Sequence, residues 1–143
     1  WFGNQLVHHV LLHKDQIGAA TLMTELLTSA LGVSGALEIV SHFMHATPTV
    51  FARYAPLVFT AAEQGDALAE QIVQQAAAHI SAIAQRLLSI NPPRLSLIGG
   101  LAHKLQPYLA LEVQQKVTPA LEAPEFGAVW FAKQSQKKAQ RIS

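Results

Sequence analysis

The stretch RLSLIGGLAHKLQP, residues 94–107, decides the predicted fold because a strand pattern passes into a helix pattern within it. Residues 95–98 are an apolar run that indicates a short buried strand. Gly99 and Gly100 follow at its end, although glycine weakens regular structure. The pair therefore either only turns the chain or lets a ligand come very close to the backbone. Spacing alone leaves both interpretations open.

The sequence after this stretch predicts one more strand and two more helices. Pro107 suits the first turn of a helix that runs to about Gln115, and KVTPAL, residues 116–121, indicates a second short strand. A last helix is predicted to start at Pro124. The order strand, helix, strand, helix implies a right-handed parallel unit. Since two strands make no stable sheet, we expect the remaining strands to come from a preceding part of the protein.

Before this stretch the sequence predicts helices almost throughout, because apolar residues recur with helical spacing. Pro56 lies inside one of them and removes a backbone donor, so it predicts a kink or two shorter helices. The longest helix carries an alanine-rich apolar stripe, which allows close approach to a flat neighbour such as a sheet. The predicted helices span residues 4–14, 20–31, 34–43 with Ser34 as cap, 49–63, and a long segment that Asp66 caps and Asn91 ends.

Composition excludes several classes of function. The chain has 143 residues, enough for one domain, and its net charge of +1 gives no nucleic-acid footprint. No apolar run reaches the roughly 18 residues that a membrane span needs. There is no cysteine, hence no disulfide framework, thiol nucleophile or iron–sulfur ligand set. We therefore expect a cytoplasmic protein with neither a membrane nor a nucleic acid as partner.

The chain is apolar for its length and begins abruptly. Half of its residues are hydrophobic and only 13% are charged, so we expect part of its surface to be covered by something else. Trp1 is not an initiator methionine, and an apolar helix pattern starts at once. We therefore expect a part of the protein to precede Trp1.

The polar residues indicate no catalytic or metal centre. His9 and His13 are four residues apart, and His42 and His45 are three apart, which are spacings that metal ligands also use. Neither pair has a cysteine or carboxylate beside it in a recognised pattern, so we interpret both as partly exposed helix histidines. Asp66 opens a long helix and is interpreted as its cap rather than as a general base.

Gly127 lies in the first turn of the predicted last helix, where glycine costs up to about 1 kcal/mol relative to alanine. It indicates either a close crossing with a helix of another domain or local helix packing.

Three segments together resemble the C-terminal half of the BadF/BadG-type ATPase family. They are YAPLVFTAAEQGDALAEQIV (54–73), RLSLIGGLAHKLQPYL (94–109) and PEFGAVWFA (124–132). Within the family they are most similar to bacterial glucosamine and N-acetylglucosamine kinases, and WFGNQL resembles the helix after that family's Gly-Ser-Gly turn. The resemblance covers about residues 1–132.

The resemblance implies the α/β fold of actin, hexokinase and Hsp70, with two ribonuclease-H-like domains around a nucleotide cleft. Residues 1–143 would be the helix-rich C-terminal ATPase domain, with about two short strands. Gly99, Gly100 and Leu101 match the adenosine motif, whose glycines let the nucleoside lie against the backbone. Gly127 and Ala128 match the second connecting helix near the interdomain hinge. ATP, Mg²⁺ and an amino sugar are implied as ligands, and a homodimer as the full-length assembly.

The chain also departs from a full family member. The first phosphate hairpin, the catalytic aspartate and the second phosphate loop have no counterpart in it. No catalytic residue and no sugar-binding residue can therefore be assigned. We expect ATP-dependent phosphorylation of glucosamine or N-acetylglucosamine by the whole protein and none by these 143 residues alone. An activator ATPase of a dehydratase is a second interpretation, which the lack of cysteine disfavours. A non-catalytic helical interaction module is a third, which a fold without a strand at 95–98 would support.

Overall fold

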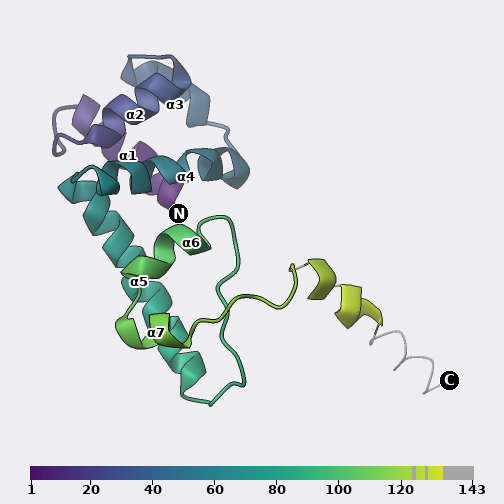
Figure 1. Cartoon of the computed structure of the whole chain (residues 1–143). Helices are drawn as coiled ribbons and strands as arrows, with labels where there is room; N and C mark the ends of the chain where they lie inside the picture. Colours follow the sequence, from purple (N-terminus) through teal and green to yellow (C-terminus); the bar gives the residue numbers. More distant parts are fainter. Residues whose placement is uncertain (124, 128, 134–143) are drawn as a thin grey trace.

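Helices form almost all of the regular structure. The computed structural model describes residues 1–123, 125–127 and 129–133. By length and hydropathy no single helix among these residues could cross a bilayer. The helices Leu22–Leu31 and Ala36–Phe43, which are bent by 66° relative to each other, would be long and apolar enough only as a pair. The elements are α1 (Phe2–Lys14), α2 (Leu22–Leu31), α3 (Ala36–Phe43), α4 (Pro48–Glu63), α5 (Ala67–Leu88), α6 (Ala102–Leu105), the 3₁₀ helix η1 (Gln106–Tyr108) and α7 (Leu111–Lys116) (Figure 1).

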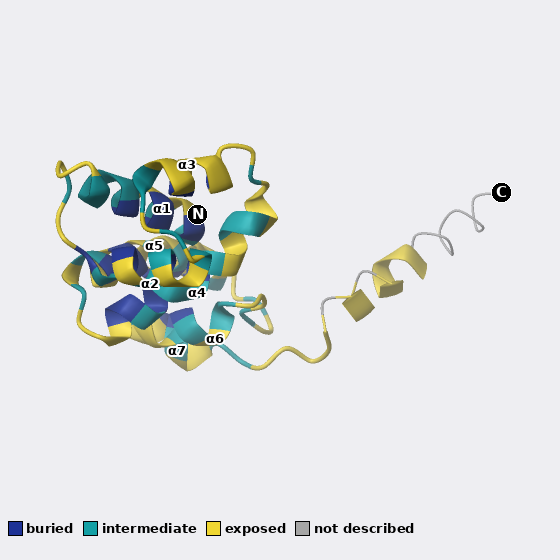
Figure 2. Ribbon diagram, turned by 90° about the horizontal axis from the view of Figure 1, so that it is seen from above, coloured by how far each residue is buried: buried dark blue, intermediate teal, exposed yellow. Residues whose placement is uncertain are grey.

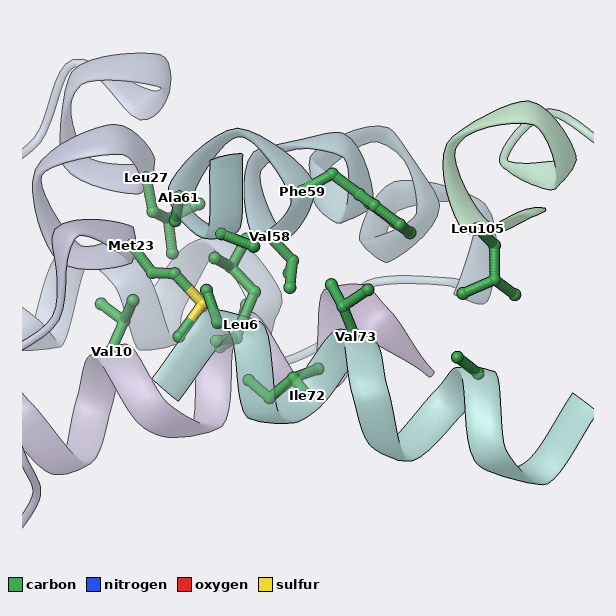
Figure 3. Close-up of a cluster of buried hydrophobic side chains, with 14 of the residues drawn as sticks. Leu6, Val10, Met23, Leu27, Val58, Phe59, Ala61, Ile72, Val73 and Leu105 are labelled. Carbon is green, nitrogen blue, oxygen red and sulfur yellow. The ribbon is translucent and has the colours of Figure 1, made fainter. Parts of the chain in front are cut away.

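The core lies where α1, α2, α4 and α5 meet. Leu6 and Val10 of α1 point toward Met23 of α2 and Val58 of α4, and all four side chains are fully buried (Figure 3). Each such side chain stabilises the fold by about 1.5–3 kcal/mol. Seen from above, buried residues lie between the helices and exposed ones on their outer faces (Figure 2). The apolar periodicity predicted from the sequence is thus confirmed as packing.

A glycine allows α1 and α4 to touch. Gly3 is buried, and a Cβ atom built on it would overlap the carbonyl oxygen of Phe51 and stand 2.6 Å from its carbonyl carbon. Only a residue without a side chain fits at this separation. Gly3 therefore fixes how closely the first turn of α1 approaches α4.

Asp66 joins the N-terminal ends of two helices. Its Oδ1 accepts a hydrogen bond from the backbone N–H of Ala69 at 2.8 Å, which caps α5 as predicted. Its Oδ2 accepts from the backbone N–H of Leu22 at 2.6 Å and from the hydroxyl of Thr21 at 2.9 Å, at the start of α2. One carboxylate thus satisfies donors of two helices that are far apart in sequence.

Two local predictions need correction. Gly35, not Ser34, is the N-cap of α3, because the Glu38 carboxylate reaches back and accepts hydrogen bonds from the backbone N–H groups of both residues. The alternative of two shorter helices at Pro56 is wrong, because α4 continues through Pro56 as one element. The alternative of a kink there stays a prediction. The Thr60 hydroxyl donates to the Pro56 carbonyl at 3.3 Å within this helix.

The two predicted strands are not formed as strands in the part of the chain that the structure describes. Residues 95–98 and 116–121 share one isolated parallel bridge, Leu95 to Val117. The Leu95 carbonyl accepts from the backbone N–H of Thr118 at 2.8 Å and from its hydroxyl at 3.1 Å. The parallel direction agrees with the prediction, but one bridge is not a ladder. A strand needs a partner along its length, and each segment has the other at only one point.

The segment around Pro107 also differs from the prediction. Pro107 lies in η1, and the helix that follows begins at Leu111. Leu109 is extended and separates the two.

The last described residues lie away from the helical body. Residues 125–127 and 129–133 are helical and project away from α7 (Figures 1 and 2). The predicted start of this helix, Pro124, lies outside the described residues. Large apolar side chains are exposed here: Leu121, Phe126, Val129, Trp130 and Phe131. The expectation, drawn from composition, that something else covers part of the surface stays a prediction.

Candidate functional site

The turn between the Leu95 bridge and α6 contains two glycines that differ in backbone conformation. Gly99 has φ +124°, a conformation that L side chains rarely adopt, and its carbonyl accepts from the Ala102 N–H at 3.1 Å where α6 starts. The fold thus explains Gly99. Gly100 has no positive φ, and a Cβ built on it would meet nothing within 4 Å. Packing inside the chain therefore gives no reason for a glycine at position 100.

An apolar pocket of about 590 Å³ opens beside this turn. The turn and α6 form one wall, and α4 with the start of α1 forms another; these elements adjoin in Figure 1. Its size falls in the range of small-molecule sites. The pocket is lined by Trp1, Phe2, Gly3, Pro48, Ala52, Ala55, Pro56, Ile80, Leu97, Ile98, Gly99, Gly100, Leu101, Ala102 and Leu105.

A second hollow of about 430 Å³ adjoins the pocket. It shares Trp1, Phe2, Ile80 and Leu105 with the pocket and extends along α5. Its further lining residues are Gln75, Ala76 and His79. Polar side chains therefore enter the adjoining hollow but not the pocket at the Gly-Gly turn.

One ion pair joins the two walls of the pocket, and one hydrogen bond joins the start of α7 to α5. Lys104 of α6 and Glu63 of α4 form an ion pair of 3.4 Å. Both side chains are partly exposed, so the pair contributes at most about 1 kcal/mol. The buried Ser81 hydroxyl of α5 accepts a hydrogen bond from the Ala110 N–H at 2.8 Å and fixes the start of α7.

The described residues include no group of three or more His, Cys, Asp or Glu side chains that could hold a metal ion. Burial tends to raise the pKa of Asp66, but hydrogen bonds from the backbone of Ala69 and Leu22 and from the Thr21 hydroxyl outweigh it, and the pKa is lowered. Asp66 is therefore a charged cap, as the sequence indicated. The pKa of His9 is lowered by burial and by the neighbouring His8.

The structure brings Gly99, Gly100 and Leu101 together on the pocket, and their role in binding stays a prediction. A Cβ on Gly127 would meet nothing within 4 Å, and Ala128 lies outside the described residues, so the connecting-helix role also stays a prediction. The α4 wall with Ala52 and Pro56 was not predicted from the sequence. The sequence carried only a proline and small residues on one predicted helix as a sign of this wall.

The homologues of this chain are bacterial hexosamine kinases, and the resemblance drawn from its segments is thereby confirmed. Glucosamine kinase GspK of Vibrio cholerae serotype O1 is 30% identical over 131 residues, which are 91% of this chain and 44% of that protein. The crystal structure described as "Putative N-acetylglucosamine Kinase from Chromobacterium violaceum" matches with a TM-score of 0.81 at 26% identity, over 91% of this chain and 45% of that one.

The chain therefore spans less than half the length of these relatives. The structural match supports an actin-like ATPase fold for a helix-rich chain. No protein-family model matches the sequence.

Proposed function

We propose that this chain forms the adenosine side of the nucleotide cleft in an ATP-dependent kinase of glucosamine or N-acetylglucosamine. One observation carries the proposal: the backbone at Gly100 is open on an apolar pocket, in a chain whose homologues are hexosamine kinases. We further propose that residues 1–143 belong to the C-terminal ATPase domain of a protein that acts as a homodimer. A cytoplasmic location stays a prediction.

The pocket chemistry suits a nucleoside. Its walls are apolar, and at Gly99 and Gly100 the turn leaves backbone atoms open to the pocket, with no protein atom within 4 Å of a Cβ built on either glycine. A purine nucleoside presents flat apolar faces, which such walls bury favourably. Gly99, Gly100 and Leu101 would lie against it and orient the nucleotide, while Phe2 and Gly3 close the pocket from the side of α1.

The chemical step requires groups beyond those described here. Transfer of the γ-phosphoryl group to a sugar hydroxyl needs a base on that hydroxyl and Mg²⁺ on the phosphates. No described carboxylate lines the pocket, and no metal-ligand group is present among the described residues. We therefore assign the residues of this chain to binding and positioning the nucleotide, and assign no Mg²⁺ ligand to them.

The alternatives are less well supported. An isolated bridge in place of a strand at 95–98 is the observation that favours a non-catalytic helical module. The kinase homologues, which match over 91% of the chain, outweigh it. An activator ATPase that passes electrons through an iron–sulfur cluster would need cysteine ligands, and this chain contributes none.

The test is an ADP-release assay on the full-length protein with a panel of sugars, repeated with the variant Gly100→Val. Valine meets no protein atom within 4 Å at its Cβ, so we expect little change in melting temperature. The KM for ATP should rise at least about tenfold, or ~1.4 kcal/mol, because the side chain enters the nucleoside space. The KM for sugar at saturating ATP should stay unchanged.

Two results would refute this proposal. If glucosamine and N-acetylglucosamine are inert while another sugar is phosphorylated, the substrate assignment is wrong. If Gly100→Val lowers the melting temperature but the folded protein binds ATP normally, the glycines only turn the chain.

A further inference from the structure

Pro56 interrupts the backbone hydrogen bonding of α4. In a helix, the carbonyl oxygen of each residue accepts the N–H of the residue four positions later, and proline has no N–H. The Ala52 carbonyl oxygen therefore lacks its ordinary partner, although both residues lie inside α4. No side chain among the described residues donates to this oxygen, whereas the Thr60 hydroxyl donates to the Pro56 carbonyl.

The unpaired oxygen lies on the side of α4 that faces the pocket. Residues four apart share a helix face, and the hydrogen bond that Pro56 prevents would run along that face. Ala52 and Pro56 both line the pocket at the Gly-Gly turn, and Ala52 is exposed, so solvent reaches this face. A ligand that displaces this solvent has to offer a donor in its place, because an unpaired carbonyl out of contact with water is costly.

Helix stability gives no reason for a proline at position 56. A proline inside a helix removes one hydrogen bond, and its ring crowds the carbonyl four residues earlier. Pro48 differs, because it is the first residue of α4, where proline suits the helix. Pro56 is only half-buried. A role at the pocket therefore explains Pro56 better than the stability of α4 does.

We infer that the Ala52 carbonyl oxygen, left free by Pro56, accepts a hydrogen bond from the exocyclic amino group of adenine and thereby selects the base. The inference rests on the proposed function and names the group that recognises the nucleotide. The amino group is the hydrogen-bond donor on the adenine edge. The side chains that line the pocket offer no other acceptor, since the indole nitrogen of Trp1 is their one polar atom and only donates.

The adjoining hollow supplies the competing hypothesis. Gln75 and His79 lie one turn apart on α5 and line that hollow but not the pocket. A base that extended into the hollow would offer its amino group to the Gln75 amide oxygen instead. The choice of nucleotide would then depend on Gln75 and not on Pro56.

The experiment measures calorimetric affinities of the full-length protein for ATP and for purine riboside triphosphate, which lacks the amino group. We expect ATP to bind at least about fivefold more tightly, because the analogue leaves the Ala52 oxygen unpaired. Pro56→Ala restores the N–H that bonds this oxygen, so the two affinities should then agree within about twofold. The melting temperature of the same variant should rise by about 2 °C or more, because α4 gains a hydrogen bond.

Pro48→Ala is the matched control. Pro48 also lines the pocket, but a new N–H at the first residue of α4 finds no carbonyl within the helix. Loss of the Pro48 ring should change both affinities by the same factor and leave their ratio at the wild-type value. Gln75→Leu should likewise leave this ratio unchanged.

Each contrary outcome identifies what failed. Equal affinities of the wild type for the two nucleotides, or a ratio that persists in Pro56→Ala, would overturn the inference while leaving the proposed function standing. A ratio that is lost in Gln75→Leu would place the base edge in the hollow and overturn it as well. A fall in the melting temperature of Pro56→Ala would show that packing explains the proline, and would remove the basis of the inference. If neither nucleotide binds, the proposed function is refuted, and this inference with it.

Discussion

Replacing Gly3 by alanine tests whether the contact between α1 and α4 sets the fold. In an unhindered helix, alanine is favoured over glycine by up to about 1 kcal/mol. Here the new Cβ would stand 2.6 Å from the Phe51 carbonyl carbon, and ordinary contact begins at 3.4 Å, so the two helix backbones must separate. Overpacking of this kind costs about 1–3 kcal/mol, and the obstacle is backbone that cannot rotate away. We expect a net loss of about 2 kcal/mol in the free energy of unfolding.

The assay is denaturant unfolding followed by circular dichroism, with Gly127→Ala as the matched control. Gly127 is also a helical glycine, but a Cβ there meets nothing within 4 Å in this chain, so in the 143-residue chain this variant should be as stable as the wild type or more stable by up to about 1 kcal/mol. If Gly3→Ala matches Gly127→Ala, the steric argument is wrong and the α1–α4 contact tolerates separation. Because Gly3 also lines the pocket, its alanine variant should weaken ATP binding as well.

Three further predictions concern charge, activity and surface. Asp66→Ala should cost about 1–2 kcal/mol at pH 7. The pKa of Asp66 is lowered in the folded protein, so this stabilisation is complete above the unfolded-state pKa and is lost as the pH falls through the folded-state pKa. The free energies of unfolding of wild type and variant should therefore converge in acid. The 143-residue chain alone should show no sugar-dependent ADP release, and measurable turnover would contradict the assignment of catalysis to other residues. The exposed Phe126, Val129 and Trp130 should bind a hydrophobic dye or associate, and ordinary dye binding by a monomeric species in light scattering would count against this.

Helices and caps were predictable because their causes are local. The periodicity that indicated helices at 4–14 and 20–31 reports which side chains face a core, and α1 and α2 form at nearly these positions. Asp66 was interpreted correctly as a cap because capping involves neighbouring backbone groups. Its second role, at the start of α2, depends on a tertiary contact that spacing does not show.

The strands and the pocket were less predictable because their causes are not local. Residues 95–98 have an apolar strand pattern, but ladder formation depends on partners elsewhere, and only Leu95 has one in the described chain. The Gly-Gly dipeptide at the end of a predicted strand was the feature that identified Gly99 and Gly100 as candidate site residues. Nothing in the pattern of α4 indicated that Ala52 would face them, because the pairing depends on how two distant helices pack. The role of Gly3 could not be predicted from the sequence either, because the close approach of α1 to the Phe51 backbone depends on tertiary packing.

The single bridge between Leu95 and Val117 has a consequence for local opening. In the described chain the Gly-Gly segment is held by this bridge, by hydrogen bonds of Arg94 and Thr118 beside it, by an exposed ion pair, and by apolar contacts in which Leu105 alone belongs to the buried core. Most of the buried core belongs to α1, α2, α4 and α5. Segments with so few contacts open at a lower free energy than the core does. A nucleotide that touches both the turn and α4 would bind only the arrangement in which the Gly-Gly segment packs against the helical body. At one hundred times its Kd, the nucleotide would stabilise that arrangement by about 2.7 kcal/mol. Nucleotide occupancy, rather than the chain's own hydrogen bonds, would then decide how often the Gly-Gly segment opens.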